Sequence, residues 1–175
     1  MPRAAVYSIR LAEAADWPAV WAILSPVFAA GLTYAYPRDI GEAAARTIWM
    51  DKPAATFVGE AADGTIAATY YLVANQPGQG AHVANCGYVV AEAARGAGWA
   101  GAMCEHSQRE ALDRGFRAMQ YNFVAETNVG AVRLWRKHGF DIVGRLPGAF
   151  CHPEAADVDA LVMYKRLAPP FSRKR

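Results

Sequence analysis

The spacing of apolar residues changes along the chain between a period of two, which is typical of strands, and a period of three to four, which is typical of helices. Strand-like spacing predicts strands at about 7–11, 56–60, 65–73, 82–90, 118–124, 140–144 and 158–165. Helical spacing predicts helices at about 17–28, 40–50, 98–114 and 128–137. The chain therefore alternates between the two kinds of element from one end to the other.

Turn and cap signals separate these segments. Asp16 stands before the first helix as its expected N-cap, and Pro18 lies in the first turn. Asp63-Gly64 predicts the turn of a hairpin between two strands. Gly115 is expected to end the third helix in a left-handed conformation.

These elements predict an α/β fold, with a twisted mixed sheet of about six to seven strands covered by about four helices. The sequence shows no repeat and no low-complexity linker, so residues 1–168 are expected to form a single domain. Residues 169–175 form a basic C-terminal tail that ends in Arg173-Lys174-Arg175. A solvated tail is the expected role of this cluster, rather than a phosphate-binding arm.

Composition narrows the class of protein. Hydrophobic residues make up 54% of the chain and charged residues 19%, so a packed core is expected. A net charge of +2 gives no support for nucleic-acid binding. The start of the chain lacks the apolar run of a signal peptide, and charged residues interrupt every apolar stretch, so we expect a cytoplasmic protein with no membrane partner. Cys86, Cys104 and Cys151 lack CxxC spacing, which indicates reduced thiols and no metal.

The clearest chemical signal lies in the loop Ala91-Glu92-Ala93-Ala94-Arg95-Gly96-Ala97-Gly98, between a strand and a helix. Such a junction exposes backbone N–H groups at the positive end of the helix dipole. Gly96 and Gly98 let a phosphate approach the backbone, and Arg95 adds a positive charge. The alternative is a glycine-softened turn that binds nothing, since the spacing matches neither a Walker loop nor a dinucleotide fingerprint.

Two motifs in this chain resemble those of the GNAT N-acetyltransferase family. Arg95-x-x-Gly98-x-Ala100 is similar to the family's R/Q-x-x-G-x-G/A signature, at the expected junction of strand and helix. Asn128-x-x-Ala131-x-x-Leu134-Trp135-x-Lys137-x-Gly139-Phe140 looks like the second motif. The resemblance covers almost the whole chain. It implies the GNAT fold, acetyl-CoA as cosubstrate and N-acetyltransferase activity.

A narrower resemblance extends from about Thr56 to Lys165. It rests on the segments Asn75-x-Pro77-Gly78, His82-x-x-Asn85-x-Gly87-Tyr88, Tyr121-Asn122-Phe123-Val124 and Glu126-Thr127-Asn128. These segments are similar to the fungal proline-analogue N-acetyltransferases, which acetylate the imino nitrogen of azetidine-2-carboxylate and related cyclic amino acids. The resemblance implies such a substrate, although local similarity says more about the cofactor than about the acceptor.

The family resemblance implies a cofactor site. It implies that the backbone amides of Arg95, Gly96, Ala97, Gly98, Trp99 and Ala100 hold the pyrophosphate of acetyl-CoA. The sheet is expected to open between the strands that end near Val90 and Val124, which makes a slot for the thioester. Val89 and Val90 are expected to offer main-chain groups to the pantetheine arm as an added strand does, and an N–H near Val89 to stabilise the oxyanion. Asn128 is expected at the reacting end.

Asparagines mark the expected substrate site. Asparagine is uncommon in strands, yet Asn85 and Asn122 fall in the two strands that flank the expected slot. Buried amides need hydrogen-bond partners, which a polar substrate would supply. The fungal resemblance implies that Asn85 and Asn122 contact the substrate, and Tyr88 is counted with them. For Asn128, a helix N-cap is a sufficient alternative explanation.

The proton transfers leave several candidates open. The attacking amine must be neutral, so a base acting through water is expected, and Glu126 and His82 are the candidates. A helix start favours Glu126 in any case, and His82 is also explained by a hydrogen bond to the adjacent turn. GNAT enzymes often carry a tyrosine where this chain has Trp135, whose indole cannot protonate a thiolate. Tyr88, Tyr121 and Asn128 are the possible substitutes, or the thiolate leaves without help.

Three functions are compatible with these residues. A small-molecule N-acetyltransferase acting by direct transfer is favoured, because the loop at 33–37 and the apolar first helices suggest a lid. A protein or peptide N-acetyltransferase and a catalytically idle acyl-CoA-binding module are the alternatives. Apolar residues in the first helices and last strands are consistent with a homodimer and equally with an ordinary core. Cys151 beside His152 is not taken as a catalytic pair.

Overall fold

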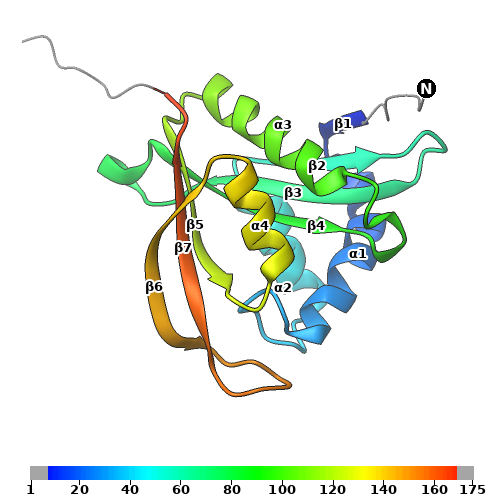
Figure 1. Cartoon of the computed structure of the whole chain (residues 1–175). Coiled ribbons are helices and arrows are strands. Elements are labelled where there is room, and N and C mark those ends of the chain that lie inside the picture. The colour runs from blue at the N-terminus through cyan, green and yellow to red at the C-terminus, as the bar shows by residue number, and fades with distance from the viewer. Residues whose placement is uncertain (1–7, 169–175) are drawn as a thin grey trace, which may run out of the picture.

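The computed structural model describes residues 8–168, which form one mixed sheet covered on both faces by helices (Figure 1). The strands are β1 (Ser8–Leu11), β2 (Ala55–Glu60), β3 (Ile66–Ala74), β4 (Val83–Val90), β5 (Ala118–Ala125), β6 (Asp141–Phe150) and β7 (Val158–Arg166). The α-helices are α1 (Trp17–Ala30), α2 (Glu42–Arg46), α3 (Trp99–Asp113) and α4 (Val129–Lys137). Tyr7 and the basic tail lie outside the described residues. The predicted fold class and the order of its elements are confirmed.

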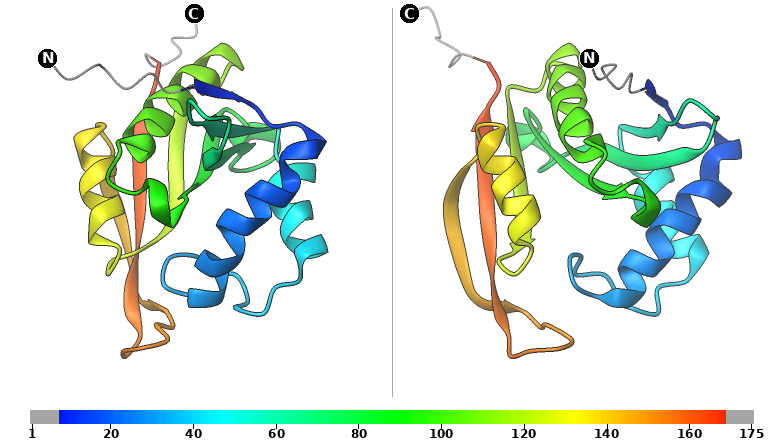
Figure 2. Two further views of the ribbon diagram at one scale, coloured as in Figure 1. Left: turned by 90° about the vertical axis from the view of Figure 1, so that its right-hand side faces the viewer. Right: turned by 45° about the vertical axis from the view of Figure 1, so that its right-hand side comes forward.

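The order of strands in the sheet creates an opening at its centre. The strands run β1-β2-β3-β4-β5-β7-β6, and every neighbouring pair is antiparallel except β4 and β5. These two parallel strands share only the register pairs Val83 with Ala118 and Ala84 with Met119. Beyond that point they separate, so the sheet splits towards the carboxyl ends of both strands, as the family resemblance implied (Figure 2).

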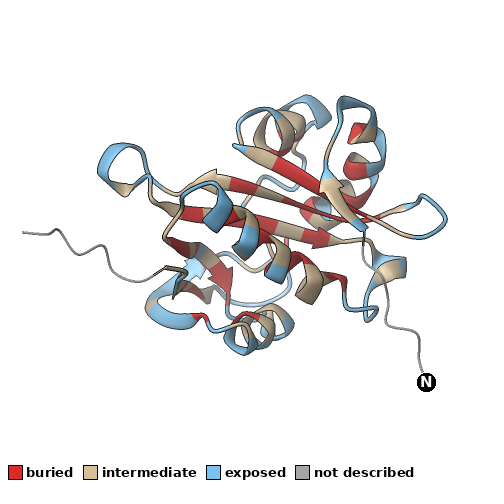
Figure 3. Ribbon diagram, turned by 90° about the horizontal axis from the view of Figure 1, so that it is seen from above, coloured by how far each residue is buried: buried red, intermediate tan, exposed pale blue. Residues whose placement is uncertain are grey.

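Two hydrophobic cores lie on opposite faces of the sheet. The first packs α3 and α4 against the central strands and contains Met103, Met119 and Phe140. The second packs α1 and the segment after α2 against the other face and contains Leu24, Phe28 and Trp49. Seen from above, the buried residues follow the central strands and the inner sides of the helices (Figure 3). Each face is therefore sealed independently, and the split between β4 and β5 runs between them.

Asp16 occupies the N-cap position of α1 without capping it. Its carboxylate accepts hydrogen bonds from Arg10 at 2.8 and 2.9 Å and from the Glu13 N–H at 2.7 Å. Arg10 also donates to Glu60 at 2.8 Å. Arg10 therefore links the edge of β2 to Asp16 at the start of α1. The predicted capping bond of Asp16 is wrong, because the guanidinium is the stronger partner.

The second predicted helix, at 40–50, is shorter than expected. It begins at Glu42 and changes after Arg46 into a π-helical turn at Thr47–Asp51. In this turn the Trp49 carbonyl accepts a hydrogen bond from the Thr56 hydroxyl at 2.5 Å, and the Trp49 indole donates to Thr69 at 3.0 Å. The wider turn thus places a fully buried tryptophan where its polar atoms reach β2 and β3.

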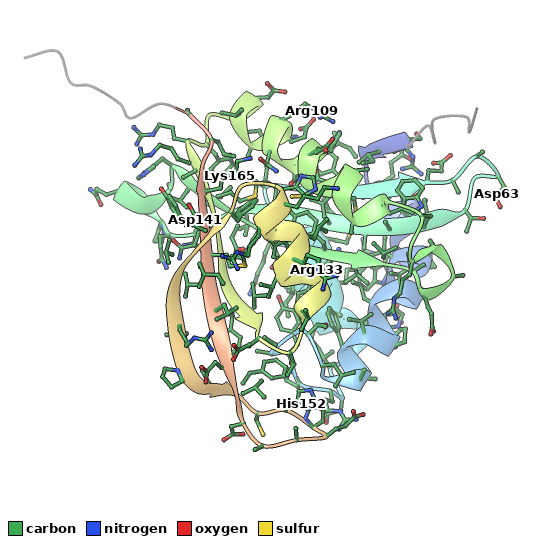
Figure 4. The ribbon with its side chains drawn as sticks, in the orientation of Figure 1. Asp63, Arg109, Arg133, Asp141, His152 and Lys165 are labelled. Carbon is green, nitrogen blue, oxygen red and sulfur yellow. The ribbon has the colours of Figure 1, made fainter. Side chains whose placement is uncertain are left out.

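Strand β6 is twice as long as the sequence predicted. It extends to Phe150 although it contains Pro147, because it is the edge strand of the sheet and needs hydrogen bonds on one side only. Almost all of its residues are exposed or half-buried, so they carry no alternating apolar pattern. At the other end of the sheet, Gly64 has a φ of 84° and Asp63 accepts a hydrogen bond from the Thr65 N–H at 3.0 Å, which confirms the predicted hairpin turn (Figure 4).

Candidate active site

The split between β4 and β5 forms the floor of a cleft of about 1490 Å³. Residues of α1 and of the segment that follows it line one side, and the start of α3 and the inner side of α4 line the other. All the cofactor residues predicted from the sequence except Ala97 line this cleft, and so do Asn85, Tyr88 and Asn122. The slot expected between the two strands and the glycine loop expected before α3 therefore belong to the same cleft.

The main-chain groups of β4 that face the opening belong to Tyr88 and Val90. The Ala91 N–H donates to the Ala67 carbonyl at 2.8 Å, and the β3–β4 register continues without a shift. Hydrogen-bonded pairs alternate in an antiparallel ladder, so Val89 is paired with Thr69 and directs its N–H and C=O towards β3. Val89 is therefore corrected as a source of main-chain groups for the pantetheine arm, while Val90 keeps that predicted role. The N–H groups of Tyr88 and Val90, the two neighbours of Val89, point away from β3 towards the split, which is compatible with the predicted donor near Val89.

The loop before α3 has the backbone of an anion site. Gly96 and Gly98 have φ angles of 78° and 90°, a conformation that favours glycine. Gly98 is the N-cap of α3, and the first N–H that bonds back into the helix is that of Ala102, to the Gly98 carbonyl at 3.1 Å. The N–H groups of the first turn, including those of Ala100 and Gly101, precede it and lie at the positive end of the dipole. Arg95 is exposed at the rim.

Two tyrosine hydroxyls lie at the base of the opening. The Tyr88 hydroxyl shares hydrogen bonds with Ser107 at 2.7 Å and with the Tyr121 hydroxyl at 3.0 Å. Burial raises the pKa of both tyrosines well above the ordinary value. Trp135 packs against both rings, with centroids 4.9 Å from each. Trp135, at the position where the resemblance implies a tyrosine, therefore packs from α4 against the two rings whose hydroxyls form this network.

The three predicted asparagines have different surroundings. Asn85 lines the cleft on the α1 side of β4, and among residues 8–168 its amide has no hydrogen-bond partner. Asn122 is exposed on β5, where its amide donates to Asn75 at 2.6 Å and accepts from Gln120 at 2.9 Å. The side chain of Asn128 accepts from the Ala131 N–H at 3.3 Å, which confirms its N-cap role, and it also lines the cleft.

The two predicted bases are engaged elsewhere. Glu126 lies outside the lining of the cleft and accepts a hydrogen bond at 2.7 Å from Arg145, which also binds Asp159. The His82 ring shares a hydrogen bond with the Gln79 carbonyl at 3.0 Å, as the structural alternative predicted. His152, next to the exposed Cys151, lies in the loop between β6 and β7 (Figure 4). The structure brings neither base into the cleft.

The loop at 33–37, which the sequence suggested as part of a lid, belongs to an aromatic cluster at one side of the cleft. Tyr34, Tyr36 and Tyr71 line the cleft and pack against the buried Phe28 and Trp49, and we call these five residues the aromatic wall. Tyr34 and Tyr36 stack at a centroid distance of 5.6 Å, and Trp49 meets Tyr71 edge-on at 4.8 Å. The Tyr34 hydroxyl donates to the Tyr88 carbonyl at 3.0 Å. The only signal in the sequence was the aromatic loop at 33–37, since the position of Tyr71 depends on strand register.

The chain belongs to the acetyltransferase (GNAT) family, whose model matches residues 17–140. A GNAT N-acetyltransferase from Kribbella flavida is 41% identical, with 91% of this chain and 97% of that chain aligned at a TM-score of 0.87. A comparison with curated proteins gave no match. The fold, the glycine loop and the split sheet therefore define this protein as a GNAT N-acetyltransferase.

More distant relatives share the fold alone. A phosphinothricin acetyltransferase from Sinorhizobium meliloti, in complex with acetyl-CoA, is 19% identical over 93% of this chain and 89% of that chain, with a TM-score of 0.82. A ribosomal-protein-alanine N-acetyltransferase from Brucella melitensis is 23% identical over 91% and 99%, with a TM-score of 0.81. One name refers to a small molecule and the other to a protein, so likeness of fold does not identify the acceptor.

Two further findings concern the described residues as a whole. Between residues 8 and 168, no group of three or more His, Cys, Asp or Glu side chains is arranged to hold a metal ion. In the same part of the chain, none of the helices has the length and apolar character needed to cross a membrane. Cys86 and Cys104 are buried, and burial raises the pKa of their thiols to about 12 and about 11. Both are therefore poor nucleophiles near neutral pH.

Proposed function

We propose that this protein transfers the acetyl group of acetyl-CoA directly to the nitrogen of a small amine. The observation that carries the proposal is the split of β4 from β5 after two register pairs, directly beside the glycine loop that begins α3. A cleft placed there is open to a cofactor from the α3 and α4 side and to an acceptor from the α1 side. The two reactants would meet in the plane of the sheet.

The cofactor follows the main-chain groups that the split leaves free. The pyrophosphate binds at the loop 95–100, where glycines and the first amides of α3 face the cleft. The pantetheine arm runs along β4 and pairs with the main chain of Val90 as an added strand would, which leaves the Tyr88 N–H for the thioester. This places the thioester between β4 and β5, near Trp135 and Asn128. The Tyr88 N–H is then the donor best placed for the developing oxyanion.

The reaction is a single displacement at the thioester carbonyl. The amine nitrogen forms a bond to the carbonyl carbon, and the carbon–sulfur bond breaks to release the thiolate of CoA. The proton that the nitrogen loses passes to water in the open cleft, because Glu126 and His82 are bound elsewhere. A thiol has a pKa of roughly 8.5, so the thiolate is an adequate leaving group near neutral pH without a tyrosine acid.

The acceptor binds on the α1 side of the sheet. Asn85 supplies an amide with both a donor and an acceptor, and it lines the cleft together with Tyr34, Tyr36 and Tyr71. Asn122 flanks the split from β5, with its amide already engaged by neighbours. The cyclic imino acids of the fungal enzymes, which carry a carboxylate, represent the amino acids in a panel of acceptors. Peptides with a free amino terminus represent the alternative substrate class.

Release of CoA thiol from acetyl-CoA, measured with a panel of cyclic, alkyl and aromatic amines, amino acids and short peptides, tests the proposal. Turnover with a small amine supports it. Turnover with peptides alone would replace it with a peptide acetyltransferase. Binding of CoA by calorimetry without turnover of any acceptor would instead indicate an acyl-CoA-binding module.

The homodimer suggested by the sequence stays a prediction. Some of the apolar residues that suggested it belong to the core, because Trp17, Leu24 and Phe28 of α1 are buried within a single chain. Strand β6 does expose Ile142, Val143 and Leu146, with Val143 60% accessible. Light scattering of the purified protein, with and without Val143→Lys, tests whether this edge strand supports a dimer.

A further inference from the structure

The two ends of the cleft differ in charge. Of the described residues that line it, Glu92 and Arg95 are the ones with charged side chains, and both belong to the loop between β4 and α3. The α1 side is lined by apolar, hydroxyl and amide groups. Within residues 8–168, the acceptor half of the cleft therefore offers no lysine, arginine or histidine.

Helix α1 contributes an uncharged surface along its full length. Its sequence from Trp17 to Ala30 contains no Asp, Glu, Lys or Arg. Its cleft-facing side includes Ala22, Pro26 and Ala30, which are exposed and present only small apolar groups. A ligand on this side would contact hydrocarbon over most of its surface.

The aromatic wall continues the same chemistry. Tyr34, Tyr36 and Tyr71 line the cleft, and burial raises the pKa of each of these phenols above its ordinary value. The Tyr34 hydroxyl is committed to the Tyr88 carbonyl. The aromatic wall therefore presents flat, neutral rings to the cleft. Among residues 8–168, Asn85 is the cleft-lining asparagine whose amide has no hydrogen-bond partner.

This distribution of charge bears on what the acceptor carries besides its amine. A carboxylate moved into such a site would lose hydration without gaining a cationic partner, which is costly. A neutral carboxamide, a ring or an alkyl chain would lose little hydration and would gain contact with the wall and with α1. A single asparagine amide suits a neutral polar group at least as well as a charged one.

We propose that the acceptor is a small cyclic, alkyl or aromatic amine with no carboxylate, and not a zwitterionic amino acid. This inference rests on the proposed acetyl transfer and specifies its acceptor. The amine binds with its apolar part between the aromatic wall and α1, and its nitrogen points towards the split beside Asn85.

Matched acceptor pairs test this proposal. Proline is compared with prolinamide and pyrrolidine, and phenylalanine with phenylalaninamide and phenethylamine, with every rate expressed per concentration of neutral amine. We expect kcat/KM to be about tenfold or more higher for the member of each pair that lacks a carboxylate. Equal or higher values for proline and phenylalanine would overturn the proposal while leaving the acetyltransferase intact.

A second experiment introduces a cationic side chain into the acceptor half of the cleft. Ala30→Arg places a guanidinium on the cleft side of α1, and Ala29→Arg places one on the adjacent exposed residue, which does not line the cleft. Ala30→Arg is expected to shift the preference towards the amino acids by about tenfold. The Ala29→Arg control is expected to keep the original ratio. Identical ratios in the two variants would contradict an acceptor site along α1.

Calorimetric binding of the same compounds to the CoA-saturated protein separates this inference from the proposed function. Preferential binding of the compounds that lack a carboxylate, without turnover, would support the proposed class of acceptor and refute acetyl transfer. Preferential binding of the amino acids would refute the acceptor class, whatever the rates. Absence of both binding and turnover for every compound would overturn both proposals.

Discussion

The hydroxyl groups of Tyr88 and Tyr121 lie 3.0 Å apart across the gap where β4 and β5 no longer pair. They join the two strands after the ladder has ended, and Ser107 anchors the pair to α3. Trp135 closes the same space from α4. The base of the cleft is thus held by a small polar network in place of main-chain hydrogen bonds, and this network occupies the hydroxyls that would otherwise be candidate acids.

Replacement of either tyrosine by phenylalanine is expected to weaken the fold more than the chemistry. Tyr88→Phe or Tyr121→Phe removes a buried hydroxyl and keeps the ring, so each should lower the free energy of unfolding by about 1–2 kcal/mol. We expect kcat to change by less than about threefold, because a phenol with a raised pKa is a weak proton donor. Urea unfolding and thiol release measure the two effects. Tyr70→Phe is the control, since its hydroxyl bonds to His106 away from the cleft.

A loss of about a hundredfold in kcat for Tyr88→Phe, with a change in the alkaline limb of the rate profile, would identify this hydroxyl as the acid after all. The thiolate would then not leave unassisted.

Asn85 and Asn122 are expected to differ in their contribution to acceptor binding. Asn85→Ala removes an amide that has no protein partner within residues 8–168, so the acceptor KM should rise by about five- to thirtyfold while the acetyl-CoA KM stays unchanged. Asn122→Ala should have a smaller effect, because Asn75 and Gln120 already satisfy that amide. Steady-state kinetics with both substrates varied test this order. The reverse order would place the acceptor nearer to β5.

Much of the fold could be predicted because most elements have one buried face. α3 and the central strands carry clear periodicity, and their bounds differ from the predicted ones by a residue or two. β6 could not be predicted to its full length, since an exposed edge strand has no buried side to create alternation. The π-helical turn at 47–51 depends on hydrogen bonds from Trp49 to β2 and β3, which are tertiary contacts.

The candidate site divides in the same way. The glycine loop could be predicted because it follows from local spacing, whereas the position of the split was available only through the family resemblance. The residues of β4 that direct their main-chain N–H and C=O groups into the split could not be predicted. This depends on which residue pairs of the β3–β4 ladder are hydrogen-bonded, and a change of one residue in the ladder would turn Val90 towards β3 in place of Val89. Two features of the site depend on contacts between distant parts of the chain, so local sequence patterns could not predict them. These are the hydrogen bond from Arg145 to Glu126 and the contact between Tyr71 and Trp49.

Asn128 allows its structural and catalytic roles to be separated. Asn128→Ala removes the N-cap of α4 and should lower the free energy of unfolding by about 1 kcal/mol. Asn128→Ser restores a capping oxygen and should recover most of that stability. If Asn128 also contacts the reacting end of the cofactor, turnover should remain low in both variants. Thermal unfolding and thiol release decide the matter, and full activity in Asn128→Ser would reduce Asn128 to a helix cap.

His106 should make stability depend on pH. Burial lowers the pKa of its imidazole, which shares a 2.7 Å hydrogen bond with the Tyr70 hydroxyl and faces Glu110, Arg109 and Arg114. The unfolded chain therefore binds a proton at a higher pH than the folded chain does. Stability is fully present above the unfolded pKa of roughly 6.5 and falls as the pH drops through the folded pKa.

Urea unfolding at several pH values between about 5 and 8 tests this dependence. His106→Gln should flatten the slope below the pKa of free histidine, and His152→Gln, in the loop between β6 and β7, should leave it unchanged. Parallel curves for the wild type and His106→Gln would show that the imidazole does not set the slope.

Gly96 and Gly115 provide a matched test of the phosphate site. Their φ angles are 78° and 83°, and a methyl group added to either would meet no atom within 4 Å, so the cost of alanine is the backbone conformation alone. Gly96→Ala and Gly115→Ala should each lower the free energy of unfolding by about 1–2 kcal/mol. Only Gly96 lines the cleft, so only Gly96→Ala should weaken CoA binding, by about tenfold, because its methyl group keeps the pyrophosphate from the backbone. Calorimetry with CoA and urea unfolding separate the two effects. Equal CoA affinity in the two variants would mean that the phosphates do not approach the chain at Gly96, and the cofactor would then have to enter the split by another route.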